Sequence, residues 1–254
     1  MKPYLLCLCA GLWLFSSCGV GSGDLVVPVS NFNEITLYVP LQLELKQGNN
    51  FQVVLNGDSA WLSHIDVIVV GTTLQVTIPP GTNFPGSSDS TGLYGVLMEV
   101  TLPDLNALTV NGLAKVRTVN TFTLDDLDVT LNGAAKVSLD LDAEDLKVNN
   151  AGASSLEIEG DLQSVDLEIA GAARFSAEGT AVQQDISILG AGSVDAFEFV
   201  TQSCGVTFIG AGEAKVQASQ SLTVSIVGAG MVYYKGQPNI DKTIIGAGAV
   251  VDAN

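Results

Sequence analysis

The chain has 254 residues, 47% of them hydrophobic, and carries 27 acidic residues against 10 basic ones. This apolar content is too high for an intrinsically disordered protein, and the length is sufficient for one large core. The net charge of −17 argues against nucleic acid as a partner, because phosphate backbones repel an acidic surface.

Residues 1–17 have the pattern of an export signal. Lys2 supplies a positive charge, and the apolar run over 4–15 is shorter than the roughly 20 residues that cross a bilayer. The string Leu14-Phe15-Ser16-Ser17-Cys18 resembles the lipobox of bacterial lipoproteins, in which the Cys thiol carries diacylglycerol after cleavage just before it. The resemblance implies lipidation at Cys18, palmitate-type acyl chains and a membrane anchor. A secretory signal cleaved at another site is the alternative.

Residues 18–31 are predicted to be a glycine-rich tether between anchor and body. In some bacteria an Asp directly after the lipidated Cys retains the protein in the inner membrane. This chain has Gly19 at that position, which favours the outer membrane of the cell envelope. Cys7 and Cys9 leave with the signal, so Cys204 is the one thiol left and no intrachain disulfide can form in the mature protein.

Residues 32–110 are predicted to form irregular strands that cap one end of the body. The run 35–45 alternates apolar and polar residues, 51–55 is a further strand, and 61–65 is a short helix or turn. The runs 67–70 and 74–78 predict a hairpin, 79–92 a loop rich in Gly, Pro and Ser, and 96–102 another strand.

Residues 111–254 contain a repeated glycine turn, Gly-Ala-Gly or Gly-Ala-Ala in most copies, with Gly-Leu-Ala at Gly112 and Gly-Ala-Ser at Gly152, at spacings of 18 to 21 residues. Its first glycines are Gly112, Gly133, Gly152, Gly171, Gly190, Gly210, Gly228 and Gly246. Alternating strands stand before and after each turn, and a repeat of this length is one coil of a β-helix. We therefore predict an all-β, single-chain parallel β-helix, right-handed because the spacing follows no strict six-residue beat. The glycines are predicted to be structural, since a larger side chain would collide with its copy in the next coil.

The residues in several blocks resemble the auto-transporter adhesin, head GIN domain family, over residues 31–251. The resemblance rests on Phe32-Asn33-Glu34-Ile35, Leu43-Glu44-Leu45-Lys46-Gln47-Gly48, Leu102-Pro103-Asp104-Leu105, and Tyr233-Tyr234-Lys235-Gly236-Gln237-Pro238 between two Gly-Ala-Gly turns. Many family members carry Ser in that turn where this chain carries Ala. The family implies an exported or lipid-anchored β-helix similar to pectin-lyase folds, and adhesion by structural likeness, with no established catalytic residues.

Candidate catalytic residues are sparse. His64 is the only histidine and has no recognisable acid–base partner, so we interpret it as structural or as a surface residue. Cys204 has no second Cys or His nearby and is interpreted as a small core or near-surface residue. The sequence predicts no catalytic residue and no cofactor.

Charged residues recur at coil spacing. At this spacing Asp126, Asp145, Asp166 and Asp185 are expected to stack near one edge. We interpret them as part of a solvated acidic face and predict no metal site; the alternative is that Ca²⁺ binds there and relieves their repulsion. Four basic residues follow the turns, and this recurrence indicates a ladder set by the repeat instead of a site: Lys115, Lys136, Arg174 and Lys215.

Two functions are compatible with this sequence. The favoured one is a cell-envelope lipoprotein whose β-solenoid body serves adhesion, ligand binding or scaffolding, with a glycan or a surface protein as partner. The alternative is a carbohydrate-active enzyme of the pectin-lyase-like type, which requires convergent carboxylates, or a carboxylate with a base, in a groove.

Overall fold

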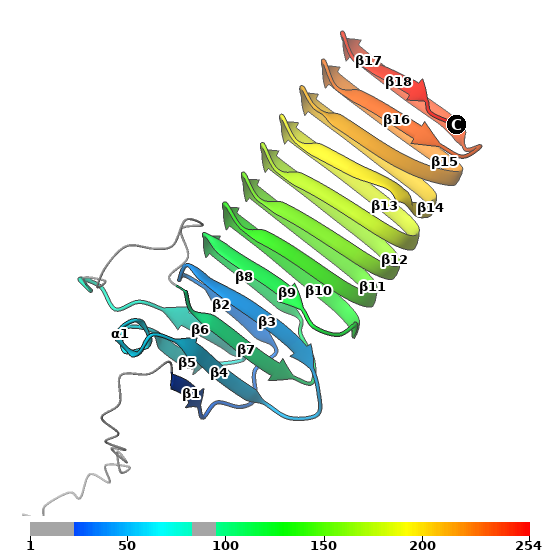
Figure 1. The fold of residues 1–254 in the computed structure, drawn as a ribbon. Helices are drawn as coiled ribbons and strands as arrows, with labels where there is room; N and C mark the ends of the chain where they lie inside the picture. The colour runs from blue at the N-terminus through cyan, green and yellow to red at the C-terminus, as the bar shows by residue number, and fades with distance from the viewer. Residues whose placement is uncertain (1–22, 83–94) are drawn as a thin grey trace, which may run out of the picture.

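The computed structural model describes residues 23–82 and 95–254. The predicted signal peptide, Cys18 and most of the loop predicted at 79–92 lie outside the described residues. The body is an all-β solenoid of about eight coils with about 19 residues per coil, which confirms the predicted fold (Figure 1). No helix within the two described ranges is long and apolar enough to cross a membrane.

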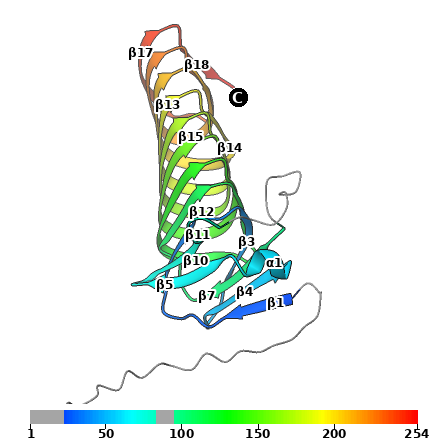
Figure 2. The same cartoon turned by 90° about the vertical axis from the view of Figure 1, so that its left-hand side faces the viewer.

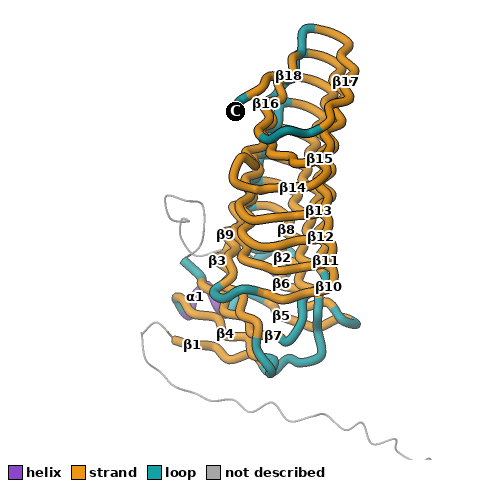
Figure 3. Tube along the Cα trace, turned by 90° about the vertical axis from the view of Figure 1, so that its right-hand side faces the viewer, coloured by secondary structure: helices purple, strands orange, loops and turns teal. Residues whose placement is uncertain are grey.

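The repeated coils are built from long strands that bend once. These long strands are β10 (Phe122–Gly133), β11 (Lys136–Gly152), β12 (Ser155–Gly171), β13 (Arg174–Gly190), β14 (Ser193–Gly210) and β15 (Glu213–Gly228). The last coils are divided into β16 (Met231–Lys235), β17 (Asn239–Gly246) and β18 (Ala249–Asp252). In each coil, the residues after a turn form one layer, here face A, and the residues before the next turn form the opposite layer, face B (Figures 2 and 3). All these coils pair in parallel.

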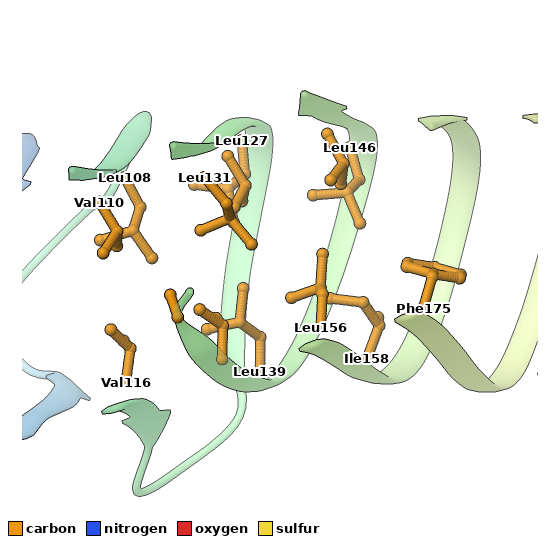
Figure 4. Close-up of a cluster of buried hydrophobic side chains, with 14 of the residues drawn as sticks. Leu108, Val110, Val116, Leu127, Leu131, Leu139, Leu146, Leu156, Ile158 and Phe175 are labelled. Carbon is orange, nitrogen blue, oxygen red and sulfur yellow. The ribbon is translucent and has the colours of Figure 1, made fainter. Parts of the chain in front are cut away.

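The core lies between the two faces and consists of aliphatic rows. Leu127, Leu146 and Val165 occupy equivalent positions in successive coils and are at most 2% exposed. Side chains from face A, such as Leu139 and Leu156, point toward them from the other layer (Figure 4). Because each buried aliphatic side chain contributes about 1.5–3 kcal/mol, these rows are the main source of stability.

The glycine turns hold one edge of the solenoid. The first glycine of each turn has a positive φ, from 109° at Gly112 to 154° at Gly152. From Gly133 on, an added Cβ would lie 2.2–2.6 Å from the carbonyl oxygen of the glycine one coil earlier. The alanine that follows donates its N–H to that same oxygen at 2.8–3.0 Å, so the ladder continues through the turn. A side chain here would meet the backbone of the previous coil. The sequence predicts a steric reason for glycine, but as a collision between copies of the side chain; the structure places the collision with the backbone.

The N-terminal strands enter the same ladder, out of sequence order. They are β1 (Gly23–Val27), β2 (Glu34–Leu37), β3 (Leu41–Gln47), β4 (Gln52–Gly57), β5 (Asp66–Val70), β6 (Thr73–Thr77), β7 (Leu97–Leu102), β8 (Ala107–Gly112) and β9 (Ala114–Thr118), with helix α1 (Ser59–Leu62) after β4. The coil β2–β3 lies between β6–β7 on one side and β8–β9 on the other, all in parallel. Strands β8 and β9 then pair with β10 and β11, so the ladder runs without interruption into the repeated coils.

Antiparallel strands cover the end of the solenoid. The predicted hairpin is present as β5 on β6, while β4 pairs with β7 and β1 pairs with β4. Strand β1 lies within residues 18–31, which the sequence predicts to be a tether, and takes up an edge position on β4. An end closed in this way presents fewer unpaired backbone groups to a second sheet.

Candidate functional site

Outward side chains at equivalent positions form rows along the solenoid, about 4.8 Å apart from coil to coil. On face A, four consecutive coils place carboxylates in one row, formed by Asp140, Glu159, Glu178 and Glu198. Three of them line a shallow hollow of about 510 Å³. The sequence contains the signal for this row, since the first three stand seven residues after their glycines and Glu198 stands eight. Sequence reasoning missed it by comparing acids at other offsets.

The acids predicted to form one stack are divided between two rows. Asp126 is in register with Asp145, and Asp166 with Asp185, but Asp145 faces Ser164 in the next coil. The first pair stands seven residues before its glycines and the second pair five, so all four cannot share a row. Among the described residues, no group of three or more His, Cys, Asp or Glu side chains is arranged to hold a metal ion.

The predicted basic ladder is also shorter than expected. Lys115 and Lys136 are in register, and Arg174 continues their row after Ser155. Lys215 instead pairs with Asp195, because it stands five residues after Gly210. The expected ladder of four basic residues therefore contains three.

Lys215 belongs to a cluster at the main irregularity of the coils. The pairing of β14 with its neighbours shifts around 196–200, which leaves Phe197 half-buried on face A. The Nζ of Lys235 lies 4.6 Å from the Phe197 ring centroid and 3.5 Å from Glu198, and Lys215 lies 3.5 Å from Asp195. Bulges of this kind re-aim side chains.

All residues of this cluster except Lys235 line a hollow of about 690 Å³, which brings carboxylates and bases together as a carbohydrate-active enzyme would require. Its electrostatics do not suit catalysis. The hydrogen bond with Glu213 and the charge of Asp195 raise the pKa of Lys215, whereas a lysine base needs a lowered pKa. The hollow therefore has the properties of an exposed ion-pair cluster.

Cys204 is in the core, 3% exposed. Burial, with a contribution from the Asp185 charge, raises its pKa to about 12, so the thiolate needed for nucleophilic attack is not formed near neutral pH. Its Sγ lies 3.9 Å from Oε1 of Gln184, which is fully buried in the neighbouring coil. His64 follows α1, and its Nδ1 lies 2.7 Å from the Ala60 carbonyl oxygen, to which it donates. Both residues are held in structural roles.

Serine and threonine side chains of face B in coils β13–β15, together with Asp166 and Asp185, line a hollow of about 510 Å³. We call this surface the hydroxyl field and define it by Ser187, Ser203, Thr207, Ser221, Thr223 and Ser225. Gly205 lies at its centre, between Asp185 in one coil and Thr223 in the next. Sequence reasoning missed this region, although a glycine inside a strand, away from the turns, was a usable signal.

An apolar stripe runs beside the hydroxyl field, just before the turns of the last four coils. It consists of Leu189, Ile209, Val227 and Ile245, which are 44–64% exposed. Earlier coils place Asn111, Asn132, Ala151 and Ala170 in the same row. Exposed apolar stripes on a soluble surface mark places where other molecules bind.

A family model described as "Putative auto-transporter adhesin, head GIN domain" matches residues 31–238. The chain belongs to this family. No curated protein sequence matches it.

Solved structures share the fold of this family member. A crystal structure named as a putative adhesin from Parabacteroides distasonis has a TM-score of 0.83 at 22% identity, covering 92% of this chain and 98% of its own. A second from that organism, named as a putative lipid binding protein, has a TM-score of 0.80 at 20% identity and covers 91% and 96%. A putative adhesin from Parabacteroides merdae has a TM-score of 0.81 at 19% identity, and the match covers 91% of this chain and 96% of that one. At these identities the similarity establishes the solenoid fold alone.

Proposed function

We propose that the protein is a cell-envelope lipoprotein, anchored by a lipid on Cys18, whose solenoid binds a ligand in adhesion or in scaffolding of the envelope. The family description supports a role in attachment. The resemblance of residues 14–18 to a lipobox supports the anchor. Gly19 supports the outer membrane as its location.

The observation that carries the proposal is the separation of the two ends. Strand β1, the described element nearest to Cys18, lies at the capped end, and the stack of coils extends from there to β17 and β18 (Figure 1). A chain anchored at Cys18 would therefore hold its hydroxyl field and apolar stripe on the coils farthest from the anchor. This is the arrangement expected of a surface that meets a partner outside its own membrane.

The anchor is tested by labelling cells with a palmitate analogue. Cys18→Ala should lose the label and accumulate as the uncut precursor, whereas Cys9→Ala, within the signal, should label normally. Fractionation and protease treatment of intact cells then locate the labelled protein. Normal labelling of the Cys18 variant would contradict the anchor.

Binding is tested with the purified body, residues 19–254, on isolated envelopes and on intact cells. Ile209→Ser removes an exposed side chain from the apolar stripe and should reduce retention. Val182→Ser is the matched control, because Val182 is 40% exposed but lies outside the stripe. Absence of retention of the unaltered body on both surfaces would overturn the binding function.

A further inference from the structure

Gly205 occupies a position where the backbone does not demand glycine. The turn glycines have positive φ, but Gly205 is not among the residues with positive φ and lies inside β14 in an ordinary parallel ladder. A glycine in such a place weakens a strand, and often marks a close approach by another group. Here the group that approaches is a side chain: an added Cβ would lie 2.3 Å from Oδ1 of Asp185.

Asp185 is held over this gap by its neighbour. The amide Nε2 of Gln183 donates to Oδ2 of Asp185 at 2.7 Å, so one carboxylate oxygen is bonded and the other lies above Gly205. Asp166 stands one coil earlier in the same row. Both carboxylates line the hollow and accept hydrogen bonds from any donor placed in it.

The hydroxyl field surrounds these carboxylates with groups that both donate and accept. The hydroxyls of Ser187, Thr207, Thr223 and Ser225 make no hydrogen bond to another group within residues 23–82 and 95–254. The Ser221 hydroxyl donates to Ser203 at 3.0 Å. Four hydroxyls without a partner in the described chain, beside two carboxylates, can form hydrogen bonds with several neighbouring hydroxyl groups of one ligand.

The same lining argues against other ligand classes. No lysine, arginine or aromatic residue of the described chain lines the hollow, so phosphates, sulfates and uronates lack a counter-charge and flat rings lack a stacking partner. The hollow is also open to solvent along face B, and rows of equivalent positions continue beyond it in both directions. A chain of repeated polar units fits this geometry.

We propose that the hollow over Gly205 binds a neutral polyhydroxylated ligand, a segment of uncharged polysaccharide, through Asp166, Asp185 and the hydroxyl field. This inference rests on the binding function proposed above and names the ligand class. Asp185 and Asp166 accept hydrogen bonds from sugar hydroxyls. Thr207 and Thr223 donate to and accept from neighbouring hydroxyls along the chain.

The test is retention of the purified body on neutral polysaccharides (dextran, mannan, galactomannan) and on acidic ones (alginate, polygalacturonate), followed by titration with the best binder. We expect binding to a neutral polymer and weaker or no binding to the acidic ones. Gly205→Val, which fills the hollow, should abolish binding, and Asp185→Asn should weaken it about tenfold or more, because hydrogen bonds to charged groups are the stronger ones.

Thr207→Val should weaken binding about 2- to 10-fold with the fold intact, as loss of a neutral hydrogen bond predicts. Thr130→Val is the matched control: Thr130 lies in the same row of face B, four coils earlier and outside the hollow, so this variant should bind normally. Circular dichroism shows whether Gly205→Val is folded. If this variant does not fold, Thr207→Val tests the site in its place.

Three results would overturn the inference. They are retention of none of the neutral polymers, equal effects of Thr207→Val and Thr130→Val, and binding that EDTA removes and Ca²⁺ restores, which would mean recognition through a bound cation. If the body binds envelopes or cells but no neutral polymer, this inference fails and the binding function stands. If it binds neither, both fail.

Discussion

The N-terminal strands and the repeated coils use the same parallel ladder, yet they achieve it differently. In the repeated coils each strand pairs with the next one in the chain, and a glycine turn recurs at the same edge. In the N-terminal region, β2–β3 lies between two coils that come later in the sequence, and three antiparallel strands are added at the end. Inside the stack, every coil can pair with its neighbours in the same parallel way. The coil at the end has no further neighbour, so other strands must cover its unpaired backbone groups.

The two regions also differ in what they expose. In the repeated coils, residues at the same distance from the turn glycine form one row along the surface. The residue type can change along such a row, from Asn132 to Leu189 for example, and this alters the surface without altering the core. The N-terminal region instead uses its side chains to join strands: Gln47 bonds to the backbone of Pro103 and Thr123. The N-terminal region therefore closes the solenoid, whereas the repeated coils carry the surface that we propose to bind a ligand.

The largest expected effect contrasts two glycines with positive φ. At Gly210 an added Cβ would lie 2.3 Å from the Gly190 carbonyl oxygen, whereas at Gly71, in the β5–β6 hairpin, nothing lies within 4 Å. We expect Gly210→Ala to lower the free energy of unfolding by more than about 4 kcal/mol and Gly71→Ala by about 1 kcal/mol. Urea denaturation measures both, and equal losses would contradict the stacking explanation.

The second prediction concerns alkaline pH and the buried thiol of the repeated coils. The pKa of Cys204 is raised from 9.0 to about 12 in the folded state. Below pH 9 the thiol is protonated in both states; between pH 9 and 12 it ionises in the unfolded state only, so stability falls as pH rises. We expect the unaltered protein to lose about 1 kcal/mol per pH unit more than Cys204→Ala over this range. Parallel stability curves for the two proteins would show that the folded thiol titrates normally.

A smaller effect is expected at the polar residues inside the core. The Nε2 of Gln184 is buried without a hydrogen-bond partner in the described chain, so Gln184→Leu should raise stability by about 1 kcal/mol. Asn150→Leu is the comparison: the Nδ2 of Asn150 is also buried without a partner in the described chain, but its Oδ1 accepts from Ser154 at 2.8 Å, and replacement leaves that hydroxyl unpaired. Thermal unfolding should rank Gln184→Leu above the unaltered protein and above Asn150→Leu. The opposite rank would mean that the Gln184 amide is satisfied.

The smallest effect is expected at surface ion pairs, one in each region. Arg117 of β9 pairs with Glu44 of β3, and Lys235 pairs with Glu198 beside Phe197. Each pair has an exposed partner, Arg117 or Glu198, and a half-buried one, so solvent screens both. Arg117→Ala and Lys235→Ala should each cost less than about 1 kcal/mol, and less at high salt. A large loss at Arg117 alone would indicate that this pair is needed to join the N-terminal coil to the rest.

The repeat made the coils predictable, because burial and turn geometry recur at a fixed offset from each glycine. The order of the N-terminal strands was not predictable, since alternation reports only which face a residue occupies and β3 pairs with strands more than 50 residues away. The acidic row and the two aspartate pairs could have been separated by counting from the glycines, as Asp145 and Asp166 show. Gly205, a glycine inside a strand, marks the region of the hollow in the sequence, but the shape of the hollow depends on the direction of the Asp185 side chain, which no sequence pattern encodes.

Carboxyl footprinting tests the assignment of ligand binding to the repeated coils most directly. Carbodiimide-driven amide coupling, read by mass spectrometry, compares the labelling of each Asp and Glu with and without the neutral polysaccharide that binds best. We predict that Asp166 and Asp185 lose label on binding while Glu159 and Glu178 of face A, and Glu99 of the N-terminal region, label as before. Protection of the face A row or of Glu99, with Asp166 and Asp185 unchanged, would contradict the account.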